Sequence, residues 1–127
     1  MNLRWPLRIN EERRDGALVL ALRGRLGASS AVSLNRAVNE AIGRGDARLV
    51  IDLVGVDYVS SAGLKALATS ASLCTRAGGG LALCGLDEPV RIAFELGGIA
   101  DVPVEPSRDR AIARVSGTVN SPGSRQR

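Results

Sequence analysis

The sequence contains no histidine, and this absence excludes several kinds of site. Without an imidazole there is no Ser-His-Asp or Cys-His catalysis and no His-ligated metal. The two cysteines, Cys74 and Cys84, are too few and too widely spaced for a Cys-only zinc site or a disulfide framework. We therefore expect a non-enzymatic protein without metal or cofactor, in which both cysteines are small core residues.

Aromatic residues and long apolar runs are also scarce. Only 2% of the residues are aromatic, so the core must consist of Leu, Val, Ile and Ala side chains. No stretch approaches the roughly 18 consecutive apolar residues that would indicate a membrane span. Residues 1–15 lack the apolar block of a secretory signal. The sequence thus predicts a cytoplasmic protein that does not insert into a membrane.

The net charge of +4 is concentrated at one end of the chain. Residues 108–127 contain five arginines and one aspartate, whereas the preceding residues carry equal numbers of acidic and basic side chains. We interpret the arginine-rich end as a solvated tail on a neutral folded body. A nucleic-acid-binding protein usually presents a basic face with aromatic or amide side chains that contact bases. The sequence shows no such face, so we expect no nucleic-acid partner.

The length of 127 residues is typical of one domain, and the apolar pattern predicts that it opens with a β-hairpin. Leu7 and Ile9 alternate with polar residues, and Asp15-Gly16 separates them from the apolar run 17–22. Asp-Gly between two strand-like runs favours a tight turn because both central residues need positive φ. The second run is apolar at every position, which is typical of a strand covered on both faces.

Helices and strands are expected to alternate after the hairpin. Ser29 or Ser30 is the expected cap of the first helix. The apolar stripe of that helix comprises Ala31, Leu34, Val38, Ala41 and Ile42. The stripe of the second helix comprises Leu64, Leu67, Ala68, Ala71 and Cys74, while Lys65, Thr69, Ser72 and Arg76 face outward. Gly78-Gly79-Gly80 lacks the context of a nucleotide-binding loop and is interpreted as a helix stop.

Two more helices and three strands complete the pattern. A third helix follows Asp87, with an inner face of Val90, Ala93 and Phe94, and a fourth spans residues 108–115. Strands are predicted at residues 48–53 and 81–84, and at 102–104 as an edge strand because it contains proline. The order predicts an α/β domain over residues 7–115 and a disordered basic tail over residues 116–127.

The densest polar cluster lies between the strand at residues 48–53 and the second helix. Ser60 and Ser61 lie at the start of that helix, where unpaired backbone N–H groups and a partial positive charge favour a phosphate. The simpler interpretation is that one of these serines is only an N-cap. Asp52 and Asp57 lack an accompanying nucleophile, phosphate-binding loop or third carboxylate, so strand-end and turn roles are favoured over catalysis.

Residues 49–64, LVIDLVGVDYVSSAGL, resemble the core motif of STAS domains, in particular the anti-sigma-factor antagonists. Three flanking segments fit the same family: Gly24-Arg25-Leu26, Gly79-Gly80-Leu81 and the region from Gly85 to Leu96. The resemblance extends from about Leu7 to Val115. It implies a single domain with a mixed, mostly parallel β-sheet, an N-terminal hairpin and about four helices.

The resemblance also implies a function as a switch in a bacterial partner-switching pathway. Such antagonists bind an anti-sigma factor that is also a serine kinase, and thereby release a sigma factor for transcription. Phosphorylation of a serine at the start of the second helix ends the complex, and a serine phosphatase restores it. The family motif places this serine at Ser61, because Ser60 before it occupies a position often held by Asp. Ser60 is the less favoured candidate.

The expected partner-binding residues surround this helix start. They are Gly27, Ser60, Ser61, Ala62, Gly63, Lys65 and Thr69. Many family members carry Asp at the position of Gly27, and its absence is expected to weaken kinase recognition or alter the interface. Asp52 and Asp57, close in sequence, are expected to add like charge near a phosphate. An alternative is a cytoplasmic subunit of a lipid-transporting ABC system, in which the same helix docks on an ATPase without phosphorylation.

Overall fold

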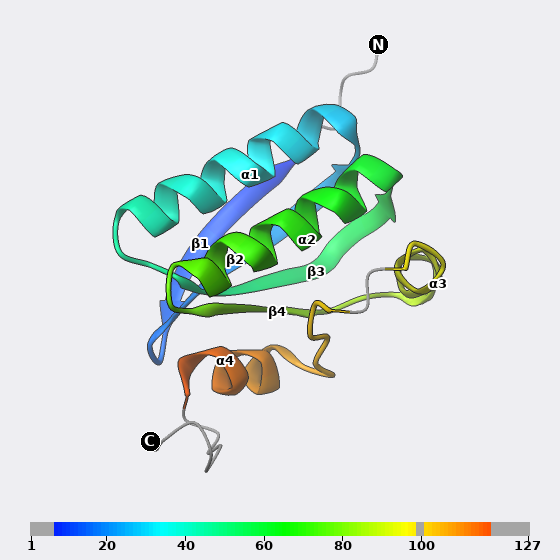
Figure 1. The fold of residues 1–127 in the computed structure, drawn as a ribbon. Coiled ribbons are helices and arrows are strands. Elements are labelled where there is room, and N and C mark those ends of the chain that lie inside the picture. Colours follow the sequence, from blue (N-terminus) through cyan, green and yellow to red (C-terminus); the bar gives the residue numbers. More distant parts are fainter. Residues whose placement is uncertain (1–6, 99–100, 118–127) are drawn as a thin grey trace.

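The computed structural model describes residues 7–98 and 101–117, which form one four-stranded sheet with helices on both faces (Figure 1). The strand order is β1-β2-β3-β4; β1 pairs antiparallel with β2, and the other pairs are parallel. The predicted mixed, mostly parallel α/β fold is therefore confirmed. The elements in chain order are β1 (Arg8–Arg14), β2 (Ala17–Leu26), α1 (Ala28–Gly43), β3 (Arg48–Val59), α2 (Ser61–Arg76), β4 (Gly80–Cys84), α3 (Glu88–Leu96) and α4 (Arg108–Ser116).

The hairpin between β1 and β2 is confirmed at the predicted turn. Arg14 lies opposite Ala17, so Asp15 and Gly16 are the two turn residues. Both have positive φ, 49° and 87°, the backbone conformation that a two-residue turn of this kind requires. Asp tolerates this conformation because its short side chain can satisfy nearby backbone groups, and Gly has no Cβ to clash.

The strand predicted at residues 48–53 does not stop at a polar turn; β3 continues to Val59. The prediction was wrong because β2 and β3 keep pairing past Asp52 by means of two register shifts. Each shift inserts one extra residue into β3, which leaves polar and apolar residues side by side on its outer surface. A strand interrupted by bulges loses its period-2 pattern, so the pairing is invisible in the sequence.

Helices α1 and α2 cover one face of the sheet, as expected for successive parallel strands joined by right-handed crossovers (Figure 1). Three of the predicted α1 stripe residues are fully buried: Leu34, Val38 and Ala41. The buried face of α2 is rotated from the prediction, because Ala66 and Ser70 are buried while Ala68 and Ala71 are only half-buried. The reason is α1, whose Asn35 amide donates hydrogen bonds to Ser70 Oγ at 3.0 Å and to the Ala66 carbonyl at 3.2 Å.

The N-cap of α1 is Gly27, so the prediction of Ser29 or Ser30 as the cap was wrong. Ser30 lies one turn inside the helix, where its Oγ accepts a hydrogen bond from the Gly27 N–H at 2.8 Å. The same hydroxyl donates to the Arg25 carbonyl at 2.7 Å. Ser30 therefore fixes the loop that enters α1 without being the capping residue itself.

Helix α4 covers part of the opposite face through a small apolar cluster. Its members are Ala17, Val19, Val50, Ala82, Cys84, Ala111, Ile112 and Val115.

Burial raises the pKa of the Cys84 thiol to about 12 and that of Cys74 to about 11. Both cysteines are therefore protonated core residues, as the sequence predicted.

An ion pair anchors the start of α4 to the sheet. Arg108 contacts the buried Asp52 carboxylate through Nε at 3.0 Å and through its NH2 nitrogen at 2.9 Å, and it reaches Glu12 at 3.0 Å. The hydrogen bond to Asp52 raises the pKa of Arg108.

Three of the five C-terminal arginines lie in α4, so the expectation of a basic tail separate from a neutral body is corrected.

The last predicted elements are partly confirmed. Helix α3 begins at the predicted Asp87 cap, whose carboxylate accepts a hydrogen bond from the Val90 N–H at 3.1 Å. The predicted strand at 102–104 is reduced to a single bridge between Leu83 and Val104. Helix α4 extends through Ser116, one residue into the predicted tail, and Gly117 follows it with φ 83°. Residues 118–127 lie outside the described part of the chain.

Replacing Asp52 should destabilise the fold, since the Val54 N–H would lose its acceptor and Arg108 would keep only the exposed Glu12. We expect Asp52→Ala to lower the free energy of unfolding by about 2 kcal/mol, less than for a fully buried pair because Arg108 is partly exposed. Asp52→Asn keeps an acceptor for Val54 and should cost about half as much. Urea unfolding measures both variants. The exposed Asp57→Ala is the control, and an equal loss there would contradict the assignment.

Candidate functional site

The candidate site lies where β2 and β3 end and helices α1 and α2 begin. The Ser60 N–H donates a hydrogen bond to the Leu26 carbonyl at 2.9 Å, which joins the ends of the two strands. Gly63 packs so closely on the same carbonyl that a Cβ there would collide with it. Two helix N-termini are therefore held side by side, each with backbone N–H groups that the helix itself does not satisfy.

The structure gives the two serines different roles. Ser60 is the N-cap of α2, and its Oγ accepts a hydrogen bond from the Gly63 N–H at 3.1 Å. Ser61 is the first residue of the helix, is exposed, and forms no hydrogen bond through its side chain with another described residue. The capping role that the sequence left open between them belongs to Ser60. The hydroxyl that remains accessible is that of Ser61.

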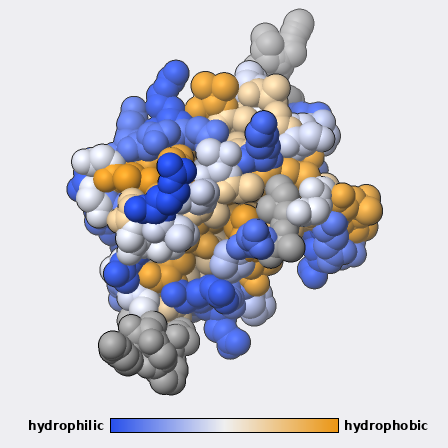
Figure 2. Space-filling view, in the orientation of Figure 1, coloured by the Kyte–Doolittle hydropathy of each residue, from blue (hydrophilic) through white to orange (hydrophobic). Residues whose placement is uncertain are grey.

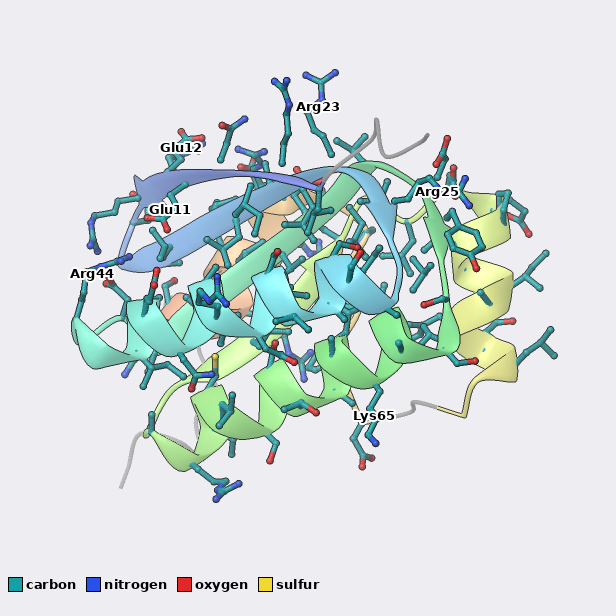
Figure 3. All side chains as sticks on the ribbon, turned by 90° about the horizontal axis from the view of Figure 1, so that it is seen from above. Glu11, Glu12, Arg23, Arg25, Arg44 and Lys65 are labelled. Atoms are coloured by element: carbon teal, nitrogen blue, oxygen red, sulfur yellow. The ribbon has the colours of Figure 1, made fainter. Side chains whose placement is uncertain are left out.

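The other predicted partner-binding residues lie around this pair. A Cβ at Gly27 would lie 4.0 Å from Ser60 Oγ, so a longer acidic side chain at this position would reach the serines. Lys65 and Thr69 are exposed on successive turns of α2. Figure 3 shows Lys65 projecting from this helix. Ala62 is half-buried, and Gly63 is buried beneath the first turn.

Asp52 does not lie at this site, which corrects one expectation. It is separated from Val59 by most of the bulged strand β3, roughly 20 Å at the usual rise per residue. Its charge is also paired with Arg108 on the other face of the sheet. Asp57 remains exposed near the end of β3 and is the acid of the motif that lies closer to Ser61.

Two features beside the site were not predicted from the sequence. The Arg25 guanidinium lies 4.3 Å from the centre of the Tyr58 ring, a cation–π contact across the ends of β2 and β3. Their pairing depends on a register shift and has no local signal. The second feature is α3, whose Ile92 and Leu96 are 45% and 83% exposed. Ile92 and Leu96 are four residues apart and lie on the side of the helix opposite the buried Val90 and Phe94. This spacing in the sequence could have predicted an exposed apolar face.

Helix α3 lies next to the start of α2. A Cβ at Gly97, directly after α3, would come within 2.5 Å of Leu64 Cδ1 in the first turn of α2. The apolar patch at the right edge of Figure 2 lies over α3. Ser61, Lys65 and the exposed side of α3 therefore border one continuous region of the surface.

This region presents an exposed hydroxyl, a lysine and exposed apolar side chains. Within residues 7–98 and 101–117, no group of three Cys, Asp or Glu side chains could hold a metal ion. None of the helices that the structure describes is long and apolar enough to cross a membrane. A free hydroxyl at a helix N-terminus has fixed N–H dipoles and a partial positive charge nearby, which stabilise an added phosphate.

The fold and this site define the class of protein: residues 8–111 match the STAS domain model, and the chain belongs to the STAS domain family. It is 33% identical over 108 residues to BtrV of Bordetella bronchiseptica, by name an anti-sigma factor antagonist, covering 84% of this chain and 93% of BtrV.

Solved structures share the same fold. An anti-sigma factor antagonist from Mycobacterium paratuberculosis aligns with a TM-score of 0.76 at 26% identity, covering 86% of this chain and 93% of that one. The phosphorylated form of the Bacillus cell fate determinant SpoIIAA aligns with a TM-score of 0.65 at 16% identity, covering 84% and 98%. The second similarity concerns the fold alone.

The two serines should respond differently to truncation. Ser60→Ala removes the cap of α2 and is expected to lower the free energy of unfolding by about 1 kcal/mol. Ser61→Ala removes an exposed hydroxyl that has no hydrogen-bond partner among the described residues, and it should change the free energy of unfolding by less than about 0.5 kcal/mol. Urea unfolding of the two variants measures this difference. Equal losses, or the reverse order, would contradict the assignment of Ser60 as the cap.

Proposed function

We propose that this protein is an anti-sigma-factor antagonist controlled by phosphorylation of Ser61. It binds an anti-sigma factor that is also a serine kinase and thereby releases a sigma factor. Phosphorylation of Ser61 by that kinase ends the complex, and a serine phosphatase restores it. The protein itself catalyses no reaction.

The observation that carries the proposal is the free hydroxyl of Ser61 at the start of α2. A kinase needs an accessible hydroxyl, and Ser61 is exposed while Ser60 is engaged by the Gly63 N–H. Family membership and the name of the relative BtrV support the same conclusion. Modification of Ser61 leaves the Ser60 cap in place, so the fold should survive phosphorylation.

Electrostatics explains how a phosphate would act on binding instead of on folding. It adds about −1.5 to −2 charges at one point of the surface. Within the protein, the N-terminus of α2 and Lys65, one turn along the same face, favour this charge. A partner surface packed on Ser61 must instead bury a dianion. Gly27 provides no carboxylate at the site, so the free energy that weakens binding comes mainly from the partner and from desolvation, with Asp57 adding like charge near the end of β3.

The exposed side of α3 offers an apolar anchor beside Ser61. Leu96 is among the most exposed large apolar residues of the described chain, and covering its side chain would remove apolar surface from water. The packing of Gly97 on Leu64 brings this residue next to the first turn of α2. We propose that the anti-sigma factor covers both α2 and this end of α3.

Phosphorylation is tested by capture from native cells with wild-type protein, Ser61→Ala and Ser61→Asp. We expect wild type and Ser61→Ala to retain an ATP-binding serine kinase and Ser61→Asp to bind it at least tenfold more weakly, about 1.4 kcal/mol. The purified kinase with ATP should phosphorylate wild type and Ser60→Ala but not Ser61→Ala, as measured by mass spectrometry.

Two other outcomes would contradict the proposal. Retention of transporter ATPase subunits by all three variants would favour the ABC-subunit alternative. Phosphate on Ser60 in the Ser61→Ala variant at the wild-type rate would move the control point to the capping residue. Each variant is first checked by urea unfolding, so that lost binding is not confused with lost folding.

The apolar anchor is tested separately with Leu96→Asp. We expect this variant to bind the captured kinase at least tenfold more weakly without a change in stability, because the side chain is 83% exposed. Thr75→Asp places the same charge on an exposed residue near the far end of α2 and is the matched control. Titration calorimetry gives both affinities. Equal affinities for the two variants would exclude α3 from the interface.

A further inference from the structure

Helix α4 covers only half of the outer face of the sheet. Its apolar cluster contacts the first halves of β2 and β3, at Val19 and Val50, together with Ala82 and Cys84 of β4. The second halves of β2 and β3 extend past this cover, and their outward residues are exposed: Val54 by 76% and Tyr58 by 43%. The described helices α1 and α2 cover the other face (Figure 1).

Three arginines project from this uncovered region. Side chains on a strand alternate between faces, so Arg23 and Arg25 share the outer face with Val19. Arg8 of β1 lies directly opposite Arg23 in the antiparallel pairing and so projects from the same face. With the exposed Val54 and Tyr58, these residues form what we term the outer-face patch (Arg8, Arg23, Arg25, Val54 and Tyr58).

The glycine at position 55 contributes to the shape of the outer-face patch. Gly55 lies opposite Arg23, and a Cβ there would come within 2.8 Å of both Arg23 Cγ and the Leu22 carbonyl oxygen. The start of the Arg23 side chain therefore packs over Gly55, and the guanidinium extends away from the sheet (Figure 3). A larger residue at position 55 would displace it.

The positive charge of the outer-face patch is not neutralised within the described chain. Arg8, Arg23 and Arg25 form no ion pair with a described residue. Ion pairs do form at Arg13 and Arg14 near the hairpin turn and at Arg44 after α1. Arg8 and Arg23 lie directly opposite one another on neighbouring strands. Like charges in this arrangement repel and destabilise the pairing.

Nearby acids do not compensate. The Asp52 carboxylate is paired with Arg108, and Asp87 caps α3. Asp57 is exposed on the same stretch of β3 and lies beyond ion-pair distance of the three arginines. The region therefore retains an excess of positive charge.

We propose that the outer-face patch binds an acidic segment of a partner protein. Its Arg25–Tyr58 end lies beside the Ser61 site, whereas Arg8 and Arg23 lie farther along β1 and β2. Carboxylates suit guanidinium groups because the two pair through parallel hydrogen bonds, and a carboxylate between Arg8 and Arg23 relieves their repulsion. Val54 and Tyr58 offer apolar contact area for side chains that flank the acids. Figure 3 shows Arg23 and Lys65 on opposite sides of the molecule, so a segment bound at Arg8 and Arg23 leaves the exposed face of α2 accessible.

The contacts favour an acidic protein segment over other polyanions. Single-stranded nucleic acids are bound by aromatic rings on which bases stack, and Arg25 already lies over the ring of Tyr58. Anionic membranes are recognised by clusters of about four to eight basic residues, more than this patch contains.

The test uses a short fluorescein-labelled peptide of glutamates with a single leucine as the probe, and fluorescence anisotropy as the readout. We expect the Arg8→Glu/Arg23→Glu double variant to bind the peptide at least tenfold more weakly than wild type, and the wild-type affinity to fall with added salt. The control is Arg36→Glu/Arg76→Glu, which makes the same charge change at exposed arginines of α1 and α2 and should stay within twofold of wild type.

Several outcomes would overturn the proposal. No binding of the peptide, or equal weakening by the control variant, would show that the patch has no specific role. Equally tight and equally Arg8/Arg23-dependent binding of phosphatidylglycerol vesicles or of single-stranded DNA would show a general polyanion surface. Ser61→Asp should bind the peptide as wild type does, so failure here is distinguishable from failure of the Ser61 proposal.

Discussion

The hydrogen bond from the Ser60 N–H to the Leu26 carbonyl is the contact on which the candidate site depends. It joins β2 and β3 at their ends and so fixes where α1 and α2 begin. Gly63 then packs on the same carbonyl, which leaves no room for a side chain at position 63. Because these two contacts attach the first turn of α2 to the end of β2, the sheet sets the position of the Ser61 hydroxyl.

The two adjacent serines divide structural and chemical work between them. Ser60 satisfies an N–H that the helix cannot, while Ser61 has no structural task in the described chain. A residue that contributes little to folding can change its charge at little cost to the fold. This separation is what a modification that acts on binding requires, since the modified and unmodified forms must both remain folded.

The two faces of the sheet also differ in role: one supplies most of the core, and the other is partly uncovered. One face is filled by large aliphatic side chains beneath α1 and α2, and it supplies most of the core. The other is held by small side chains and by the Arg108–Asp52 ion pair, which leaves the ends of β2 and β3 uncovered. The second face therefore has surface to offer a partner. Its exposed apolar residues Val54 and Tyr58 come from the bulged strand β3, and its arginines come from β1 and β2.

Local sequence signals determined much of this protein. Asp15-Gly16 specifies the hairpin, the helical apolar spacing identifies the helices, and the motif around Ser61 indicates the family. Only the tertiary structure decided the length of β3, the cap of α2 and the partner of Asp52. The physical reason is that each of these depends on a contact between distant segments: β3 on its pairing with β2, Ser60 on the Leu26 carbonyl, and Asp52 on an arginine 56 residues away. Periodicity describes how one segment meets the core, whereas register and ion pairing are properties of two segments together.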